Sequence, residues 1–144
     1  MTGSTAIEGG CHCGTVRYRI DGEIDWVAHC HCDMCRKASG GTVMTWLRVP
    51  AKALRFTGDE PQRYQSSRQL FRSHCPVCGA QIHCAADDEP GWAYVTVASL
   101  DRPEEVPPGR ADWTADALPW ITLDPHLPTN PGEPPDNAVG DQGS

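Results

Sequence analysis

The sequence predicts a single all-β domain, built as a sandwich or as coiled sheets, that bound metal helps to stabilise. Three observations lead to this prediction. Short runs of alternating or β-branched residues are separated by turn residues about every eight to twelve positions. Helical periodicity is almost absent. Seven of the eight cysteines fall into three tight clusters that have the spacing of metal ligands.

The predicted strands follow from side-chain alternation and from the turn residues that end each run. Val16, Tyr18 and Ile20 share one face of the first strand, and two arginines share the other. Residues 92–98 form the clearest strand, because β-branched and aromatic residues dominate them. In chain order, the expected strands are residues 15–20, 43–49, 54–56, 62–65, 69–73, 80–84, 92–98 and 118–123.

Two local features complete the predicted secondary structure. The fourth and fifth strands are expected to form a hairpin around residues 66–67, which are both serine. One short helix is expected over residues 33–39, because the two glycines at 40–41 end it. Little other helix is predicted.

The composition changes near the C-terminus. Residues 124–144 contain five prolines, three glycines and almost no large apolar side chains. Such a segment cannot bury enough apolar surface to offset the entropy lost on ordering. We therefore predict a zinc-binding β domain over residues 1–123 and a flexible tail over residues 124–144.

The charge and the apolar content restrict the partners. The formal net charge is −7 and the pI is about 5.2, whereas nucleic-acid-binding surfaces are usually basic, so no nucleic-acid partner is expected. Residues 1–10 lack a signal peptide, and no stretch approaches the roughly eighteen apolar residues of a membrane span. We expect a cytoplasmic location without membrane association. In a reducing cytosol, clustered cysteines act as metal ligands rather than disulfides.

The first and third clusters are predicted to form one structural zinc site. Cys11 and Cys13 are two residues apart, so an extended backbone directs both sulfurs to one side. Cys75 and Cys78 flank a turn, and Gly79 directly after them suits a tight backbone. The two pairs are separated by 61 residues. Structural zinc supplies about 10 kcal/mol or more, which exceeds the entropy cost of closing a loop of that length.

The second cluster, Cys30, Cys32 and Cys35, can direct three thiolates to one metal ion. If a side chain supplies the fourth ligand, both zinc sites are structural. If none does, water or substrate takes that position, as in a catalytic site. Iron is a weaker alternative to zinc. The candidate fourth ligands are Cys84, His29, His31, His74 and His83, although Cys84 is better interpreted as a small buried hydrophobic residue on a strand.

Further segments accompany the cysteines in a fixed order. They are residues 10–18, 29–37, 40–41, 54–59, 64–67, 75–79 and 98–101, followed by Trp113 and the Leu118-Pro119-Trp120 triplet. In this order and spacing they resemble the family of glutathione-dependent formaldehyde-activating enzymes, with the related centromere protein V. The resemblance covers roughly residues 8–123, which is most of the predicted domain.

The resemblance implies the Mss4-like fold of coiled antiparallel β-sheets with two zinc ions per chain. The implied ligands are Cys11, Cys13, Cys75 and Cys78 for a structural zinc, and Cys30, Cys32 and Cys35 for a catalytic zinc. Two positions depart from the family pattern and put the substrate in question. His74 stands where an aromatic residue is common, and Ala111-Asp112 stand where His-Ile is common.

The resemblance also implies a zinc-dependent carbon–sulfur lyase that forms or cleaves an adduct of the S-(hydroxymethyl)glutathione type. Its partners would be a small thiol such as glutathione and a small aldehyde. A zinc ion held by three thiolates suits this chemistry, because an incoming thiol binds as thiolate and stays nucleophilic. Arg36 and Lys37, directly after the second cluster, are candidates to attract a substrate carboxylate, although two solvated surface charges are the simpler interpretation.

Two functions of other classes are also compatible with the cysteines. A non-enzymatic interaction module would have two closed structural zinc sites. Metal sensing or storage would exploit the density of thiols. A fourth protein ligand at the second cluster favours the module, and an open position favours the enzyme.

Overall fold

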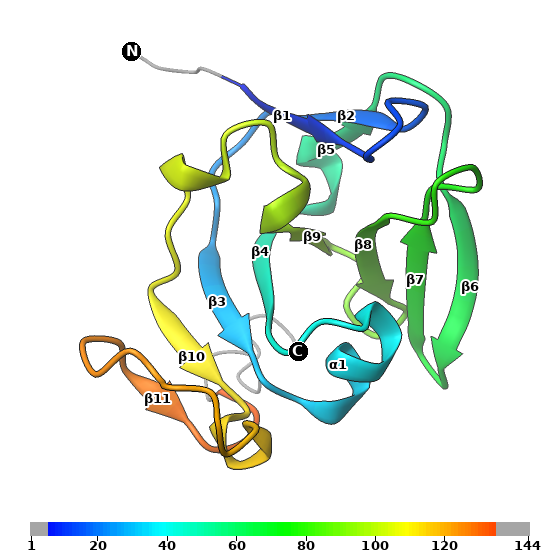
Figure 1. Ribbon diagram of the computed structural model, residues 1–144. Helices are drawn as coiled ribbons and strands as arrows, with labels where there is room; N and C mark the ends of the chain where they lie inside the picture. The colour runs from blue at the N-terminus through cyan, green and yellow to red at the C-terminus, as the bar shows by residue number, and fades with distance from the viewer. Residues whose placement is uncertain (1–5, 135–144) are drawn as a thin grey trace.

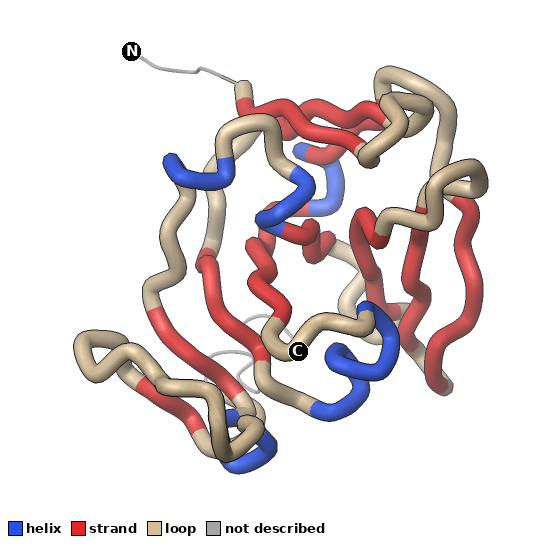
Figure 2. Tube along the Cα trace, viewed as in Figure 1, coloured by secondary structure: helices blue, strands red, loops and turns tan. Residues whose placement is uncertain are grey.

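The computed structural model describes residues 6–134. Within them the chain forms two β-sheets, one α-helix, α1 (Asp33–Ser39), and short 3-10 helices, so the all-β prediction with little helix is confirmed (Figure 2). The strands are β1 (Ile7–Gly10), β2 (Arg17–Ile20), β3 (Trp26–Cys30), β4 (Met44–Pro50), β5 (Leu54–Phe56), β6 (Gln62–Ser67), β7 (Leu70–His74), β8 (Gln81–Ala86), β9 (Trp92–Thr96), β10 (Arg110–Asp112) and β11 (Thr129–Asn130). The 3-10 helices are η1 (Ala51–Ala53), η2 (Val97–Ser99), η3 (Pro103–Glu105) and η4 (Thr114–Asp116).

The two sheets differ in size and connectivity. The small sheet has the antiparallel order β1-β2-β5, and the large sheet has the order β11-β10-β3-β4-β9-β8-β7-β6. Neighbours in the large sheet are antiparallel, except that β10 pairs in parallel with both β3 and β11. Figure 1 shows the small sheet lying across one end of the curved large sheet, with α1 near the opposite end.

The central strand β4 is buried on both faces. Leu47 and Val49 pack in an aliphatic core with residues of the small sheet, such as Tyr18 and Ile20. Trp46, which points the other way, belongs to a second cluster with other aromatic residues and four cysteines. Because successive side chains of a strand face opposite sides, one sheet separates the two environments. Each environment contains one of the two cysteine groups described below.

The predicted strands are largely present, with shifted ends. Each of the first seven predicted ranges overlaps a strand between β2 and β9, and the helix lies where it was predicted. The hairpin turn lies at residues 68–69 rather than 66–67, because β6 continues to Ser67 through an irregular register after Gln65. Strands β1, β3, β10 and β11 were not predicted.

The predicted strand at residues 118–123 is wrong. The Ile121 amide donates to the Leu118 carbonyl at 3.0 Å, which closes a turn. Pro119 occupies the second position of that turn, where its fixed φ is favourable and its missing N–H is not needed. The apolar side chains of this segment belong to a turn rather than a strand, and Trp120 is 69% exposed.

The predicted flexible tail falls partly within the described residues. Residues 124–134 are described, and β11 in this range extends the large sheet beside β10. Residues 135–144 lie outside the described residues, and the flexible tail over residues 124–144 stays a prediction. Between residues 6 and 134, no helix is long and apolar enough to cross a membrane.

Candidate metal centres and the adjoining cavity

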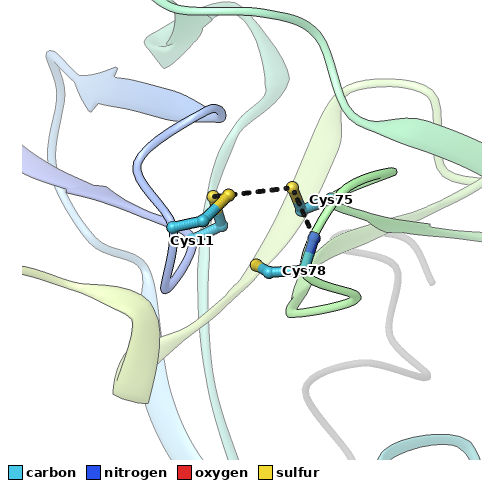
Figure 3. Close-up of side chains that lie close together, drawn as sticks. Cys11, Cys75 and Cys78 are labelled. Atoms are coloured by element: carbon cyan, nitrogen blue, oxygen red, sulfur yellow. Dashed lines mark hydrogen bonds between the residues drawn. The ribbon is translucent and has the colours of Figure 1, made fainter.

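Four cysteines from two distant segments form the first group, here called the four-sulfur cluster: Cys11, Cys13, Cys75 and Cys78. Their sulfurs all lie within 4.8 Å of one another. The Cys11 and Cys13 sulfurs are 3.6 Å apart, and those of Cys13 and Cys75 are 3.8 Å apart. Tetrahedral zinc with Zn–S bonds of about 2.3 Å separates its sulfurs by about 3.8 Å. Figure 3 shows Cys11 facing Cys75 and Cys78 from the opposite loop.

The backbone around the four-sulfur cluster has the form of two similar turns. Gly14 and Gly79, each directly after a cysteine pair, have φ of 87° and 81°, which favours glycine. Amide groups point at the sulfurs: Val16 N lies 3.2 Å from Cys11 Sγ. Burial opposes ionisation of Cys11, but the Val16 amide and the neighbouring thiols lower its pKa to about 6. The positive φ of Gly79 confirms its expected role in a tight turn.

The second group, here called the three-sulfur cluster, comprises Cys30, Cys32 and Cys35. Cys30 ends β3, and Cys32 caps the N-terminus of α1, where its sulfur accepts a hydrogen bond from the Cys35 amide at 3.4 Å. The Cys30 sulfur lies 3.4 Å from that of Cys32 and 3.6 Å from that of Cys35. The sulfur-only donors and their spacing fit a zinc ion.

No fourth ligand joins the three-sulfur cluster from the part of the chain that the structure describes: no other His, Cys, Asp or Glu groups with its sulfurs. Cys84 lies nearby on β8 and is buried, and burial raises the pKa of its thiol to about 12. This environment agrees with its interpretation as a small hydrophobic residue. The four candidate histidines, His29, His31, His74 and His83, also lie outside the group.

A cavity of about 220 Å³ opens beside the three-sulfur cluster. All three cysteines line it, together with Cys84, and most of the remaining wall is aromatic or aliphatic. These wall residues are Trp26, Ala28, Met34, Trp46, Leu70, Ala86, Tyr94, Trp113 and Pro134. A mostly apolar cavity with a few polar groups at one end is the usual form of a small-molecule site.

Three charged side chains also line the cavity: Arg72, Glu89 and Asp112. The Arg72 guanidinium approaches the cluster, with Nη2 at 3.8 Å from Cys35 Sγ. Hydrogen bonds from the Cys30 and Cys32 thiols, with the charge of Arg72, lower the pKa of Cys35 to about 2 although burial opposes this. Metal ligands must be deprotonated, so this shift favours a metal at Cys35, whereas the pKa values of the neighbouring Cys30 and Cys32 thiols are raised.

The two basic residues expected to contact substrate lie elsewhere. Arg36 donates through Nη1 to the carbonyl oxygens of His31 and Asp116, at 2.8 and 2.6 Å, and so joins α1 to η4. Neither Arg36 nor Lys37 is among the residues that line the cavity. Their role in substrate binding stays a prediction.

The two departures from the family pattern have different surroundings. The His74 ring packs against Tyr64 with centroids 5.9 Å apart. Asp112 is buried at the cavity wall, where it accepts hydrogen bonds from Arg110 Nε and from Asn130 Nδ2, each at 3.0 Å. The aspartate is therefore held in place by β10 and β11.

The sequence did not point to the other cavity residues. Arg72 lies directly opposite Cys84 across the β7–β8 pair, and Trp46 lies opposite Ala28 across β3–β4. These pairings bring together residues that are distant along the chain. The one local signal in the sequence was Arg72 itself. It lies two positions after Leu70, so the charged and the apolar side chain share one face of β7.

The fold and the two cysteine groups define a β protein with two sites that could bind zinc, one of them beside an apolar cavity. A model of the glutathione-dependent formaldehyde-activating enzyme family matches residues 6–116, and the chain belongs to this family. A Rhodobacter sphaeroides protein of known crystal structure, a structural-genomics target, is similar to it with a TM-score of 0.55 and 24% identity. That match covers 65% of this chain and 87% of the other, and at this identity it concerns the fold alone.

Proposed function

We propose that the protein is a zinc-dependent carbon–sulfur lyase that forms or cleaves a thiol–aldehyde adduct of the S-(hydroxymethyl)glutathione type. One observation carries the proposal. The three-sulfur cluster lines a cavity of about 220 Å³, and no fourth ligand comes from residues 6–134. Membership of the formaldehyde-activating family supports the choice of glutathione and formaldehyde as substrates.

Cys30, Cys32 and Cys35 would hold the zinc ion, which when bound would keep an incoming thiol deprotonated and nucleophilic at neutral pH. The chain's own residues then prepare the reaction. The Cys35 amide holds the Cys32 sulfur at 3.4 Å, and the apolar wall limits water around the reacting atoms. Attack by the thiolate on the aldehyde carbon forms the carbon–sulfur bond, and a proton taken up by the oxygen completes the adduct. Cleavage is the reverse.

The charges of the cavity also bear on the substrates. Its lining includes one cation, Arg72, and two carboxylates, Glu89 and Asp112. Glu89 accepts a hydrogen bond from Tyr94, and Asp112 is paired with Arg110, so both carboxylates are already partnered. A neutral aldehyde and a single thiolate suit this lining better than several substrate carboxylates do.

The alternative of a closed zinc module requires a fourth protein ligand at the three-sulfur cluster. None of the five candidates belongs to the group of sulfurs that lie within 4.8 Å of one another. X-ray absorption on the zinc-loaded protein is therefore informative. If the three-sulfur site is open, the two zinc ions together have seven sulfur ligands and one lighter ligand that does not come from the protein. Eight protein ligands would reject an open site.

The reaction itself is tested by two-dimensional NMR exchange between ¹³C-formaldehyde and its glutathione adduct. Because the adduct also forms without protein, the measured quantity is exchange above a protein-free blank. We expect excess exchange with zinc-loaded protein and none with Cys32→Ser, since that variant has lost one of the three thiolates. An equal excess from Cys32→Ser would reject the proposed site.

A further inference from the structure

Arg72 is a buried cation whose hydrogen-bonding capacity is only partly used. The residue is 2% exposed, and its Nε donates to Ser66 Oγ at 2.8 Å. Its Nη2 donates to Cys35 Sγ at 3.8 Å, while Nη1 is buried with no hydrogen-bond partner. A guanidinium has five N–H donors, so most of this one's capacity is free.

No carboxylate balances this cation among residues 6–134. The nearby acids of the cavity have other partners, since Glu89 accepts from Tyr94 and Asp112 forms an ion pair with Arg110 at 3.0 Å. Buried donors without an acceptor are costly, and folded proteins rarely keep them without a role. The sulfur contact uses one donor and leaves the others available to a ligand.

We infer that the Arg72 guanidinium binds the reacting oxygen of the substrate, the atom that is a carbonyl in the aldehyde and a hydroxyl in the adduct. This assignment rests on the proposed lyase function and adds a catalytic residue to it. Arg72 and the three cysteines line the same cavity, and Nη2 is already 3.8 Å from a cluster sulfur.

The reach of the side chain selects this oxygen over other acceptors on the substrates. In the adduct, the oxygen is two bonds from the sulfur that would join the cluster. The carboxylates of a tripeptide thiol are several bonds further away. A guanidinium in contact with Cys35 Sγ is therefore placed nearer to this oxygen than to the remote carboxylates.

The chemistry is balanced without a further reagent. The thiolate sulfur shares an electron pair with the aldehyde carbon, and the carbon–oxygen π pair moves onto the oxygen. Arg72 stabilises the negative charge that develops there but stays protonated, because a guanidinium does not release its proton at neutral pH. The proton lost by the thiol returns to the oxygen through water, which gives the hydroxyl of the adduct.

A purely structural role for Arg72, as a counter-charge to the thiolates, makes different predictions. A structural cation is replaced adequately by Lys, whereas a fork that contacts both a sulfur and an oxygen is not. Arg72→Lys keeps the charge and loses the fork, and Arg72→Gln loses the charge. Arg63→Gln, on the neighbouring strand β6 and exposed, is the matched control for the lost charge.

The first measurement is formate binding by NMR titration to zinc-loaded protein saturated with glutathione. Formate is a small oxyanion, and glutathione prevents it from taking the place of the thiol. We expect formate to bind at least tenfold more weakly to Arg72→Lys and Arg72→Gln than to the parent and to Arg63→Gln. Zinc content and circular dichroism verify that each variant is folded and loaded. Formate binding that is absent from the parent, or equal in all four proteins, overturns the inference.

The second measurement is ¹³C-formaldehyde exchange. We expect a loss of about 100-fold in Arg72→Lys, in the range found when one oxyanion donor is removed, with glutathione affinity changed less than twofold. Exchange within twofold of the parent in both Arg72 variants overturns the inference and leaves the lyase function intact. No exchange above the blank in the parent, with formate binding that depends on Arg72, rejects the lyase function and supports an oxyanion site at Arg72.

Discussion

The four-sulfur and three-sulfur clusters use the same donor atoms in different structural settings. The four-sulfur cluster joins segments that are 61 residues apart, and two of its members, Cys11 and Cys75, pack in the aliphatic core between the sheets. The three-sulfur cluster comes from one short segment and lies on the other face of the large sheet, among tryptophans and beside Arg72. The four-sulfur cluster takes two cysteines from each of the segments that it joins, whereas the three-sulfur cluster takes all three from one segment. A metal at the first group would therefore cross-link the fold, and a metal at the second would not.

The largest expected effect is on stability at the four-sulfur cluster. Cys75→Ser removes a buried ligand and with it a metal whose binding contributes about 10 kcal/mol to folding, comparable to the whole stability of a domain. We expect one zinc ion per chain instead of two, and a melting temperature lower by about 15 °C or more. Metal analysis and calorimetry measure this. A melting temperature lowered by only a few degrees would show that the two clusters contribute similarly to stability.

The second prediction distinguishes two causes of acid sensitivity, which are protonation of His83 and loss of metal from the thiolate clusters. Burial, aided by the charge of Arg63, lowers the pKa of His83 to about 4, from an ordinary value of 6.5. Unfolded chains bind this proton below pH 6.5 and the folded protein does not until about pH 4. His83 therefore supports full stability above pH 6.5, and up to about 3 kcal/mol is lost as the pH falls toward 4.

Urea unfolding of the parent and of His83→Gln across this pH range measures the difference. The variant should lose less stability on acidification, because it has no side chain to protonate there. Equal losses in both proteins would assign the acid sensitivity to the thiolate clusters instead.

At the three-sulfur cluster we expect a smaller loss of stability. Cys32→Ser removes one thiolate, whereas the serine hydroxyl can still cap α1, so a loss of about 1–3 kcal/mol is expected, which is a few degrees in melting temperature. The second zinc ion should be lost and excess formaldehyde exchange abolished. A loss of stability as large as that of Cys75→Ser would remove the distinction between the clusters.

The smallest effect is predicted for Cys84. Cys84→Ala deletes one buried sulfur and should cost about 1 kcal/mol. Two zinc ions per chain should remain, since Cys84 is outside both groups. Loss of one zinc ion in this variant would identify Cys84 as a fourth ligand and would close the site.

The two cysteine groups that could bind metal were the most predictable part of the molecule. Ligand spacing within each cluster is local, so the backbone between neighbouring cysteines already restricts where their sulfurs point. The helix was predictable for the same reason, because its end at the paired glycines is encoded in adjacent residues. The pairing of the first and third clusters was inferred from ligand number and agrees with the observed group of four sulfurs.

The cavity was not predictable in the same way. Its wall depends on the lateral order β3-β4-β9-β8-β7, which no local pattern encodes. Strand β3 (Trp26–Cys30) was missed because apolar side chains occupy both of its faces, so its sequence lacks a clear polar alternation. Arg72 has the sequence appearance of a surface residue, and only its position between β6 and β8 buries it.

The nesting of one cluster inside the other along the chain has a consequence for the order of assembly. All three ligands of the inner cluster leave the ribosome within six residues, whereas the outer one is incomplete until Cys78 has been made. Contacts close in sequence form sooner than distant ones. A nascent chain can therefore acquire its first metal ion at the inner cluster, before the two sheets are joined.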